Sequence, residues 1–416
     1  MRTAQVLRKY DPAEWGGTES AVTRMLEGLG EQGVQSVLFC PRQRNPPSQP
    51  LPLPHGCSIQ FYRARVPVWG LSAQEKRQFA CVGGNLFSFD LMGALWREQG
   101  VQLIHTHTLG RLGAIAARVA LRRRAPFVVS IHGGFLDLPR RLKESFQRPE
   151  RHGFDWGRLF GWLLASRRML ERADAILTCN PTEAARLREM FPAKRVQVQP
   201  HGVKMECYRA DARNLALQKW PRLRGRRLLL CVGRVDAVKN QLWLVERVPE
   251  LCRKHPGFML VIAGPCSDEG YAEALQRRVD ELGIAEAVTF TGGLPPGDPR
   301  LPGLYQLAGV AVLPSVSETF GLVLLEAWAA GAAVIASRTS GARALVQHGE
   351  NGWLFDLERP ETFHEAANVA LNGCGAREQC ATRGRAMVQA QYDLPVIARH
   401  TRQLYYQLIE AKSCAT

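Results

Sequence analysis

Short apolar runs alternate with helix-length stretches along the whole chain. In the first half these runs have the length and composition of buried strands, and Ala/Leu/Arg-rich stretches such as 111–123 separate them. They cover residues 34–40, 103–107, 127–132 and 175–179, and the rhythm restarts after residue 225 with runs at 228–233, 259–264, 288–291, 310–313 and 333–336. Because buried parallel strands need helical crossovers, the pattern predicts an α/β protein with two doubly wound parallel sheets.

Composition excludes several classes of protein. The chain of 416 residues is 46% hydrophobic and 22% charged, which is too apolar for whole-chain disorder. No run approaches the roughly 18 consecutive apolar residues of a membrane span, and the first residues lack the apolar stretch of a secretory signal. The eleven cysteines include no Cys-x-x-Cys pair, which indicates reduced core thiols and no metal site. We therefore expect a cytoplasmic protein.

Positive charge is concentrated in the first half of the chain. The net charge is +16, and residues 1–200 carry 29 Lys and Arg against 16 Asp and Glu, a net +13. Such a field favours nucleic acid, an acidic lipid surface or a phosphate-bearing substrate. A basic nucleic-acid-binding protein is therefore an alternative from a different class. The basic residues are dispersed, without aromatic-rich basic strands or a recognition helix, so we expect no nucleic acid partner.

Two glycines, Gly16 and Gly17, separate the first strand from the first helix. Glycines permit a close backbone approach, and a helix N-terminus offers free N–H groups to an anion. For two glycines alone, the interpretation that we favour is an ordinary strand-to-helix turn.

Two cations follow the first strand of the second domain. Arg234 directly follows Leu228-Leu229-Leu230-Cys231-Val232-Gly233, and Lys239 lies five residues further along the same loop. Ligands of open α/β sheets bind beyond the carboxyl ends of the strands, and two cations there suit a diphosphate. A solvated basic loop is the alternative.

The segment 313–331 gives the strongest signal. A strand ends at Leu313, a polar loop carries Glu318, and a helix starting near Phe320 carries Glu326. The two carboxylates are placed to hold hydroxyl groups, while the N–H groups of Phe320, Gly321 and Leu322 offer the positive end of the helix to phosphate oxygens. Glu326 lies among apolar neighbours, so it needs a polar partner.

These motifs resemble those of the GT-B retaining glycosyltransferases of family four. Glu318 and Glu326 look like the family's E-x7-E motif, Gly233-Arg234 with Lys239 looks like its diphosphate clamp, and Gly16-Gly17 looks like its first glycine loop. The resemblance implies two Rossmann-like domains facing each other across a cleft. We place an acceptor-side domain at 1–205, a domain that binds the nucleotide sugar at 206–385, and a C-terminal helix at 386–416 that packs back toward the first domain.

The resemblance also implies a role for each site residue. Arg234 and Lys239 would neutralise the donor diphosphate, Glu326 would bind the ribose hydroxyls, and Glu318 would hold the donor sugar, assisted by the amides of residues 320–322. His132 would lie beside that sugar. Of His105 and His107, on one strand, we expect one to face the site and the other to be a buried core residue. Family members need no metal ion and no cofactor.

The sequence thus predicts a retaining, metal-independent transfer of a hexosyl or N-acetylhexosaminyl group. The donor would be a nucleotide diphosphate sugar, and the acceptor a glycan or a glycolipid, in polysaccharide or lipopolysaccharide biosynthesis. A nucleotide-sugar epimerase on the same fold is the alternative enzyme, which the intact Glu318, Glu326 and Arg234–Lys239 set disfavours.

The basic first half suggests a peripheral contact with an anionic membrane at its inner face. Candidate contacts are Arg122-Arg123-Arg124, Arg140-Arg141-Leu142-Lys143 and Arg167-Arg168. A solvated basic face, or one that recognises an acidic glycan, is the alternative. Residues 157–172 combine Leu, Phe and Trp with arginines, as both an interfacial helix and a core helix do, and we favour the core helix.

Overall fold

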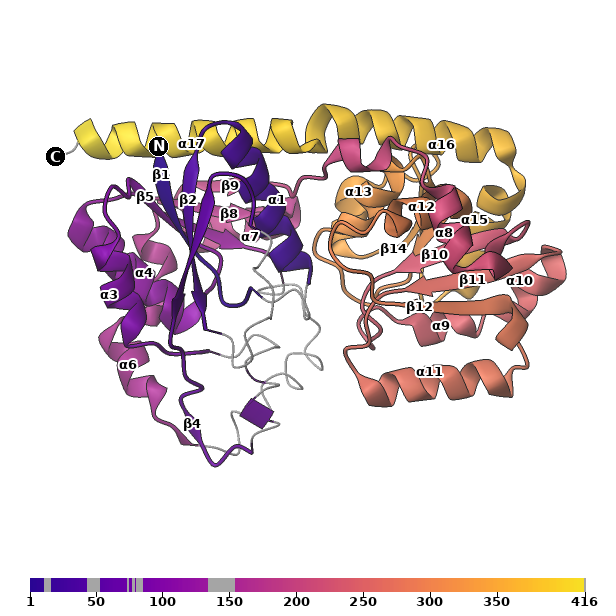
Figure 1. Ribbon diagram of the computed structural model, residues 1–416, viewed down its shortest axis with the longest axis horizontal. Coiled ribbons are helices and arrows are strands. Elements are labelled where there is room, and N and C mark those ends of the chain that lie inside the picture. The colour runs from indigo at the N-terminus through magenta and orange to yellow at the C-terminus, as the bar shows by residue number, and fades with distance from the viewer. Residues whose placement is uncertain are drawn as a thin grey trace. The chain divides into compact units, whose positions relative to one another are not determined.

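A computed structural model describes residues 1–10, 16–42, 53–72, 75–76, 79, 85–133 and 154–414. The chain divides into two compact units, unit 1 with Met1–His201 and Pro395–Thr416, and unit 2 with Gly202–Leu394 (Figure 1). The limits predicted from the sequence, 205/206 and 385/386, lie four and nine residues from these divisions. The prediction of two doubly wound α/β domains is confirmed.

Unit 1 is built on a seven-stranded parallel sheet with the strand order β3-β2-β1-β5-β6-β8-β9. The strands are β1 (Arg2–Val6), β2 (Gln35–Pro41), β3 (Cys57–Tyr62), β5 (Leu103–Thr106), β6 (Phe127–Ile131), β8 (Ala175–Thr178) and β9 (Val196–Val198). A separate antiparallel pair joins β4 (Val68–Trp69) to β7 (Phe154–Asp155). The order runs outward from β1 in both directions, as in nucleotide-binding sheets.

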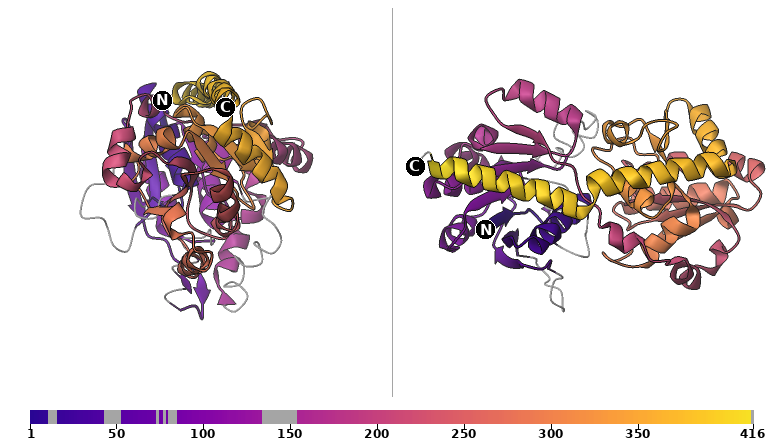
Figure 2. Two further views of the ribbon diagram at one scale, coloured as in Figure 1. Left: turned by 90° about the vertical axis from the view of Figure 1, so that its right-hand side faces the viewer. Right: turned by 90° about the horizontal axis from the view of Figure 1, so that it is seen from above.

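Helices cover both faces of this sheet. They are α1 (Gly17–Glu31), α3 (Asp90–Arg97), α4 (Gly110–Arg123), α6 (Gly157–Leu163), α7 (Pro181–Met190) and α17 (Leu394–Cys414), with 3-10 turns η2 (Ser166–Arg168) and η3 (Leu170–Arg172). Alternate strand residues face opposite sides, so Val37 and Phe39 pack in the core with α3 and α4, whereas Leu38 and Cys40 pack with α1. Tyr405 on α17 joins the core of unit 1, and Figure 2 shows this helix running along the unit.

Unit 2 repeats the design with a six-stranded parallel sheet of order β12-β11-β10-β13-β14-β15. The strands are β10 (Arg227–Val232), β11 (Phe258–Ala263), β12 (Val288–Gly292), β13 (Val310–Leu313), β14 (Ala333–Ser337) and β15 (Trp353–Phe355). The chain crosses from β10 to β11 and from β13 to β14 in opposite directions along the sheet. The carboxyl ends of β10 and β13 are therefore the switch point of this sheet, which is where open sheets bind ligands.

Nine α-helices of this part of the chain surround that sheet. They are α8 (Arg213–Lys219), α9 (Gln241–Val245), α10 (Val248–Lys254), α11 (Glu269–Glu281), α12 (Arg300–Ala308), α13 (Leu322–Ala329), α14 (Ser340–Leu345), α15 (Pro360–Asn372) and α16 (Cys374–Met387), with 3-10 turns η4 (Met205–Tyr208), η5 (Pro221–Leu223) and η6 (Ala285–Ala287) and a π-turn η7 (Val388–Tyr392). Apolar residues of α9, α10, α11 and α15 form one continuous core with the strands.

Candidate functional site

Two glycines bring the loops after β10 and β11 into contact. Gly233 and Gly264 have φ angles of 154° and 156°. A Cβ atom on Gly264 would lie 1.9 Å from the carbonyl oxygen of Gly233, so no other residue fits at position 264 without moving the backbone. The contact fixes the start of the loop that carries Arg234.

Asp236 shapes the loop between Arg234 and Lys239. Its carboxylate accepts hydrogen bonds from the backbone N–H groups of Val238 and Lys239, at 3.1 and 3.0 Å. The same carboxylate lies 3.4 Å from the guanidinium of Arg234, whose side chain is 53% exposed. Sequence analysis missed Asp236, although an Asp two and three residues before these N–H groups is typical of a side-chain-capped turn.

Lys239 joins this loop to the loop after β13. Its Nζ donates to Glu318 Oε2 at 2.5 Å, and both side chains are mostly buried. Two further bonds hold the loops together: the Val316 N–H donates to the carbonyl of Val238 at 2.9 Å, and the Asn240 side chain donates to the carbonyl of Pro314 at 3.3 Å. The structure thus brings together residues that lie 79 positions apart in the sequence.

Glu318 is held ionised in a buried position. Burial by itself raises the pKa of this carboxyl, but the charge and hydrogen bond of Lys239 and the backbone N–H groups of Phe320 and Gly321 outweigh burial and lower the pKa below its ordinary value. Gly321, with φ 92°, caps α13, which begins at Leu322. Glu318 therefore already accepts hydrogen bonds from two of the three backbone N–H groups that we expected to bind phosphate oxygens.

Glu326 has the polar partner that its apolar surroundings require. It is 7% exposed on α13, and its Oε2 accepts a hydrogen bond from the hydroxyl of Tyr305 at 3.2 Å. Tyr305, on α12, is fully buried. Sequence analysis did not identify Tyr305, because a tyrosine within an apolar helix carries no local signal of its partner.

His132, at the end of β6 in unit 1, belongs to a buried network of histidines. Its Nε2 lies 2.9 Å from Nδ1 of His107, whose Nε2 lies 3.0 Å from Oε1 of Gln5. His105 contacts the Tyr405 hydroxyl at 2.6 Å. Residues two apart on a strand share a face, and the ring centroids of His105 and His107 are 4.1 Å apart. His107 is the one that contacts His132, whereas His105 is fully buried against Tyr405 and Ser130.

The hydrogen bonds of Gln5 fix the tautomers in this network. Its amide nitrogen donates to Thr3 and to Tyr405, so its oxygen accepts a hydrogen bond from the Nε2–H of His107. His107 Nδ1 is then an acceptor, and Nε2 of His132 donates to it. The remaining nitrogen of His132, Nδ1, is a bare acceptor, buried and without a partner among the described residues.

Burial keeps these rings uncharged. It lowers the pKa of His105 to about 3 and that of His132 to about 4, and it lowers the pKa values of His107 and His201 well below their ordinary value. The rings of His132 and His201 stack with centroids 5.2 Å apart, so a charge on one would repel a charge on the other.

We expect the protein to lose stability as the pH falls from about 6.5 toward 4. A histidine whose pKa is lower in the folded state contributes its full stability above the unfolded pKa of about 6.5, and unfolding takes up its proton below that pH, with a slope of roughly 1.4 kcal/mol per pH unit for each such residue. Urea denaturation at a series of pH values measures the slope. In the variant His105→Gln the new side chain does not titrate, so the slope should fall by the contribution of about one proton, roughly 1.4 kcal/mol per pH unit.

Buried carboxylates such as Glu318 do not account for this slope, because a lowered carboxyl pKa removes stability only as the pH falls below about 4.3. A free energy of unfolding that does not change between pH 6.5 and 5 would contradict neutral histidines in the core.

Gly16 and Gly17 lie at the start of α1. The N–H of Gly16 donates to the carboxylate of Glu19 at 3.0 Å, and Glu19 is buried. The carboxylate of Glu19, in the first turn of α1, thus lies at the helix N-terminus, where we expected the donor to bind. The preceding residues 11–15 lie outside the described residues.

The described residues contain no group of three His, Cys, Asp or Glu residues placed to hold a metal ion. None of the helices within the described ranges has the length and hydropathy to cross a membrane.

Two family models match the chain, one on each unit. The model described as Glycosyltransferase Family 4 matches residues 15–206, and the model described as Glycosyl transferases group 1 matches residues 213–387. Between them they cover the histidine network and the Arg234, Lys239, Glu318 and Glu326 cluster.

Proteins similar in sequence are named as glycosyltransferases. A D-inositol 3-phosphate glycosyltransferase from Acidothermus cellulolyticus is 33% identical over 208 residues, which cover 48% of this chain and 46% of that protein. One from Corynebacterium jeikeium is 28% identical over 388 residues, 88% of this chain and 87% of that protein. A GDP-mannose-dependent alpha-(1-6)-phosphatidylinositol monomannoside mannosyltransferase from Mycobacterium tuberculosis is 28% identical, covering 74% of this chain and 76% of that protein.

Solved structures share the fold over the full length. Sucrose-phosphate synthase from Thermosynechococcus elongatus has a TM-score of 0.75 at 24% identity and covers 99% of both chains. Anabaena HepE in complex with UDP-glucose has a TM-score of 0.70 at 16% identity and covers 98% of this chain and 100% of that chain. With two doubly wound units, each matched by its own family model, the chain belongs to the family-four glycosyltransferases of GT-B fold.

Proposed function

We propose that the protein transfers a hexosyl or N-acetylhexosaminyl group from a nucleotide diphosphate sugar to a glycan or glycolipid acceptor, with retention of the anomeric configuration and without a metal ion. Its role would lie in cell-surface polysaccharide or lipopolysaccharide biosynthesis. The observation that carries the proposal is the cluster of Arg234, Lys239 and Glu318 on the loops after β10 and β13, at the switch point of the sheet.

The cluster has the chemistry for a diphosphate leaving group. Arg234 is half exposed and offers a guanidinium that can bind two oxygens, whereas Lys239 is a mostly buried point charge. Fixed cations in a partly dry site stabilise the negative charge that develops as the glycosidic bond breaks. With the charge spread in this way, a phosphate oxygen accepts the proton of the acceptor hydroxyl on the face where that hydroxyl attacks, which retains the configuration.

The two carboxylates serve different parts of the donor. Glu326, fixed by Tyr305, would accept hydrogen bonds from the ribose hydroxyls. Glu318 would hold hydroxyls of the sugar, and its bond to Lys239 would set the distance between the sugar and the diphosphate. His132, neutral and with Nδ1 as an acceptor, would lie beside the sugar.

The names of the similar proteins support both substrates. The mycobacterial relative depends on GDP-mannose and acts on a phosphatidylinositol mannoside, and HepE was solved with UDP-glucose. A nucleotide-sugar donor and an acceptor carried by a lipid are therefore the substrates to test first.

The experiment begins with a screen of UDP-, GDP- and ADP-sugars for thermal stabilisation, since a ligand at 100 times its dissociation constant adds about 2.7 kcal/mol to the free energy of unfolding. With the donor identified, we expect NMR of the product to show the anomeric configuration of the donor and EDTA to leave turnover intact. An inverted product, or activity that EDTA abolishes and Mg²⁺ restores, would contradict the proposal. Epimerised donor without transfer would favour the epimerase alternative.

A further inference from the structure

One outer face of unit 1 exposes a set of large apolar side chains. Each of them is more than half exposed: Phe89, Trp96, Leu121, Leu159, Trp162 and Leu163. They come from α3 and the residue before it, from α4 and from α6, which lie together beside the sheet in Figure 1. We call this surface the α3–α4–α6 face. Contacts across it are direct, since Phe89 packs on Phe160 of α6 with ring centroids 5.5 Å apart and Arg118 of α4 donates to the carbonyl of Leu163 at 3.1 Å.

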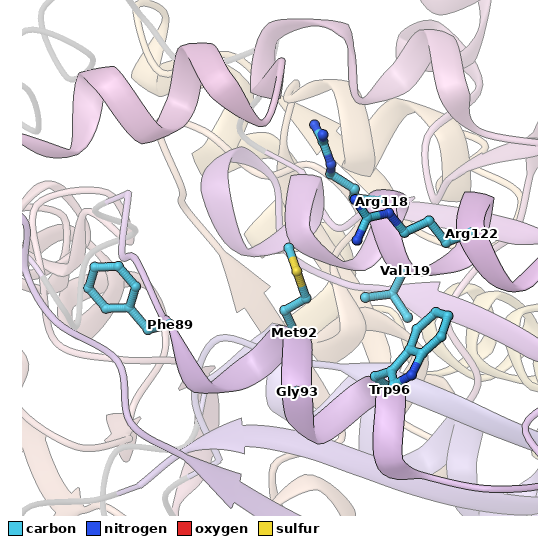
Figure 3. Close-up of a pocket in the computed structure, with 7 residues that line it drawn as sticks. All are labelled: Phe89, Met92, Gly93, Trp96, Arg118, Val119 and Arg122. Carbon is cyan, nitrogen blue, oxygen red and sulfur yellow. The ribbon is translucent and has the colours of Figure 1, made fainter.

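A pocket of about 390 Å³ opens on this face between α3 and α4. Phe89, Met92, Trp96 and Val119 supply apolar walls, and Arg118 and Arg122 come from the facing helix (Figure 3). The pocket therefore combines an apolar lining with two guanidinium groups.

The charge of the face is mainly positive, and all of its positive charge comes from arginine. Residues 90–97, 110–124 and 157–172 contain ten arginines, no lysine and two acidic residues. One of the ten, Arg111, is buried and paired with Asp155. Arg123 lies over the ring of Trp96 at 5.6 Å, so the cations and the aromatic rings are interleaved.

The core-helix interpretation of residues 157–172 holds for Leu164, Met169 and Leu170, which are buried, but it is wrong for Leu159, Trp162 and Leu163. The helix ends at Leu163 and turns follow, so the segment has an inner and an outer part. Of the predicted basic contacts, Arg122–Arg124 and Arg167–Arg168 lie on α4 and on η2 beside it, and residues 140–143 lie outside the described residues.

We propose that the α3–α4–α6 face docks on an anionic phospholipid bilayer. Tryptophan and leucine side chains favour the boundary between headgroups and acyl chains, and arginines pair with lipid phosphates while their stems lie along apolar surface. A net charge of this size and sign is complementary to an anionic leaflet and would repel most basic partners. The inference rests on the proposed function only in that a lipid-linked acceptor would be met at such a surface.

Vesicle flotation tests the proposal with the full-length protein alone. The protein should bind and float with vesicles of phosphatidylcholine that contain about 30% phosphatidylglycerol, and it should not bind vesicles of phosphatidylcholine alone. Each arginine removed should weaken binding about five-fold, so the triple variant Arg122→Ser, Arg167→Ser, Arg168→Ser should lose about 100-fold. The control is Arg383→Ser with Arg385→Ser, two exposed arginines on α16 of unit 2. If general charge explained binding, this double variant would lose about 25-fold, and we expect it to bind nearly as the native protein does.

Fluorescence locates the inserted side chains. Lipids brominated in the acyl chain quench tryptophans that enter the bilayer, and the quenching should fall in Trp96→Phe and in Trp162→Phe, which keep an aromatic ring and so keep docking. Equal flotation on neutral and anionic vesicles, or unchanged quenching in both Phe variants, would overturn the proposal. So would the absence of flotation on either kind of vesicle, which is the result expected if the face binds only another protein. Calorimetry of the donor nucleotide is independent of all three outcomes, so failure here leaves the donor site untouched.

Discussion

Lys239→Ala is expected to lower kcat/KM by about 10²–10³-fold and to lower the free energy of unfolding as well. The kinetic loss follows because a charge-assisted partner of the diphosphate is removed, which costs roughly 3–4 kcal/mol in a desolvated site. The stability loss follows because Glu318 is left buried with two backbone N–H groups but without its countercharge. Steady-state kinetics and urea denaturation measure the two effects.

The pH dependence of that stability loss identifies its cause. In the native protein the pKa of Glu318 is lowered, so the carboxylate contributes stability above its unfolded pKa of about 4.3 and loses it as the pH falls below. Without Lys239 this contribution is gone, so the difference between variant and native protein should shrink below about pH 4. A difference that stays constant down to pH 3 would mean that lost packing, and not the ion pair, explains it.

Arg234→Ala is the matched control. Its guanidinium is half exposed and lies 3.4 Å from Asp236, so its loss should leave the free energy of unfolding almost unchanged while kcat/KM falls by a similar factor. Unchanged kcat/KM in both variants would remove the diphosphate from this loop.

The arrangement of strands and the position of the donor loops could be predicted because each depends on local sequence. Buried parallel strands are apolar on both faces, which makes runs such as 228–233 and 259–264 conspicuous, and the glycines at their ends are forced by a close backbone contact. The edge strand β3 lacks this signal, since most of Cys57–Tyr62 is only partly buried. Residues 57–61 alternate between apolar and polar, as a half-exposed edge strand does, so β3 has no continuous apolar run like those that mark the buried strands.

Pairings between distant elements could not be predicted. Periodicity places Glu318 and Lys239 each at a strand end, but only the adjacency of β10 and β13 brings them within 2.5 Å. The same holds for Tyr305 with Glu326 and for Tyr405 of the last helix with His105. The shared face of His105 and His107 follows from the period of a strand, but their partners Tyr405 and His132 do not.

Glu318→Gln and Glu326→Gln are expected to separate the nucleotide from the sugar. Glu326→Gln should weaken the bare nucleoside diphosphate and the nucleotide sugar alike, about 10- to 100-fold, because a charge-assisted acceptor of the ribose hydroxyls is lost. Glu318→Gln should weaken the nucleotide sugar only. Its loss removes a negative charge beside the diphosphate and frees Lys239 from the ion pair, so the bare nucleotide should bind at least as tightly as before. Titration calorimetry with both ligands measures all four affinities.

Tyr305→Phe tests whether binding is limited by the charge of Glu326 or by the orientation that Tyr305 gives its carboxylate. The variant removes one hydrogen bond at 3.2 Å and leaves the charge and the ring in place, so binding of both ligands should fall by only a few-fold. A loss as large as that of Glu326→Gln would show that the orientation of the carboxylate, and not its charge, limits binding. If Glu318→Gln weakened the bare nucleotide as much as Glu326→Gln does, both carboxylates would contact the nucleotide, and the sugar would have to be held by residues outside the loop after β13.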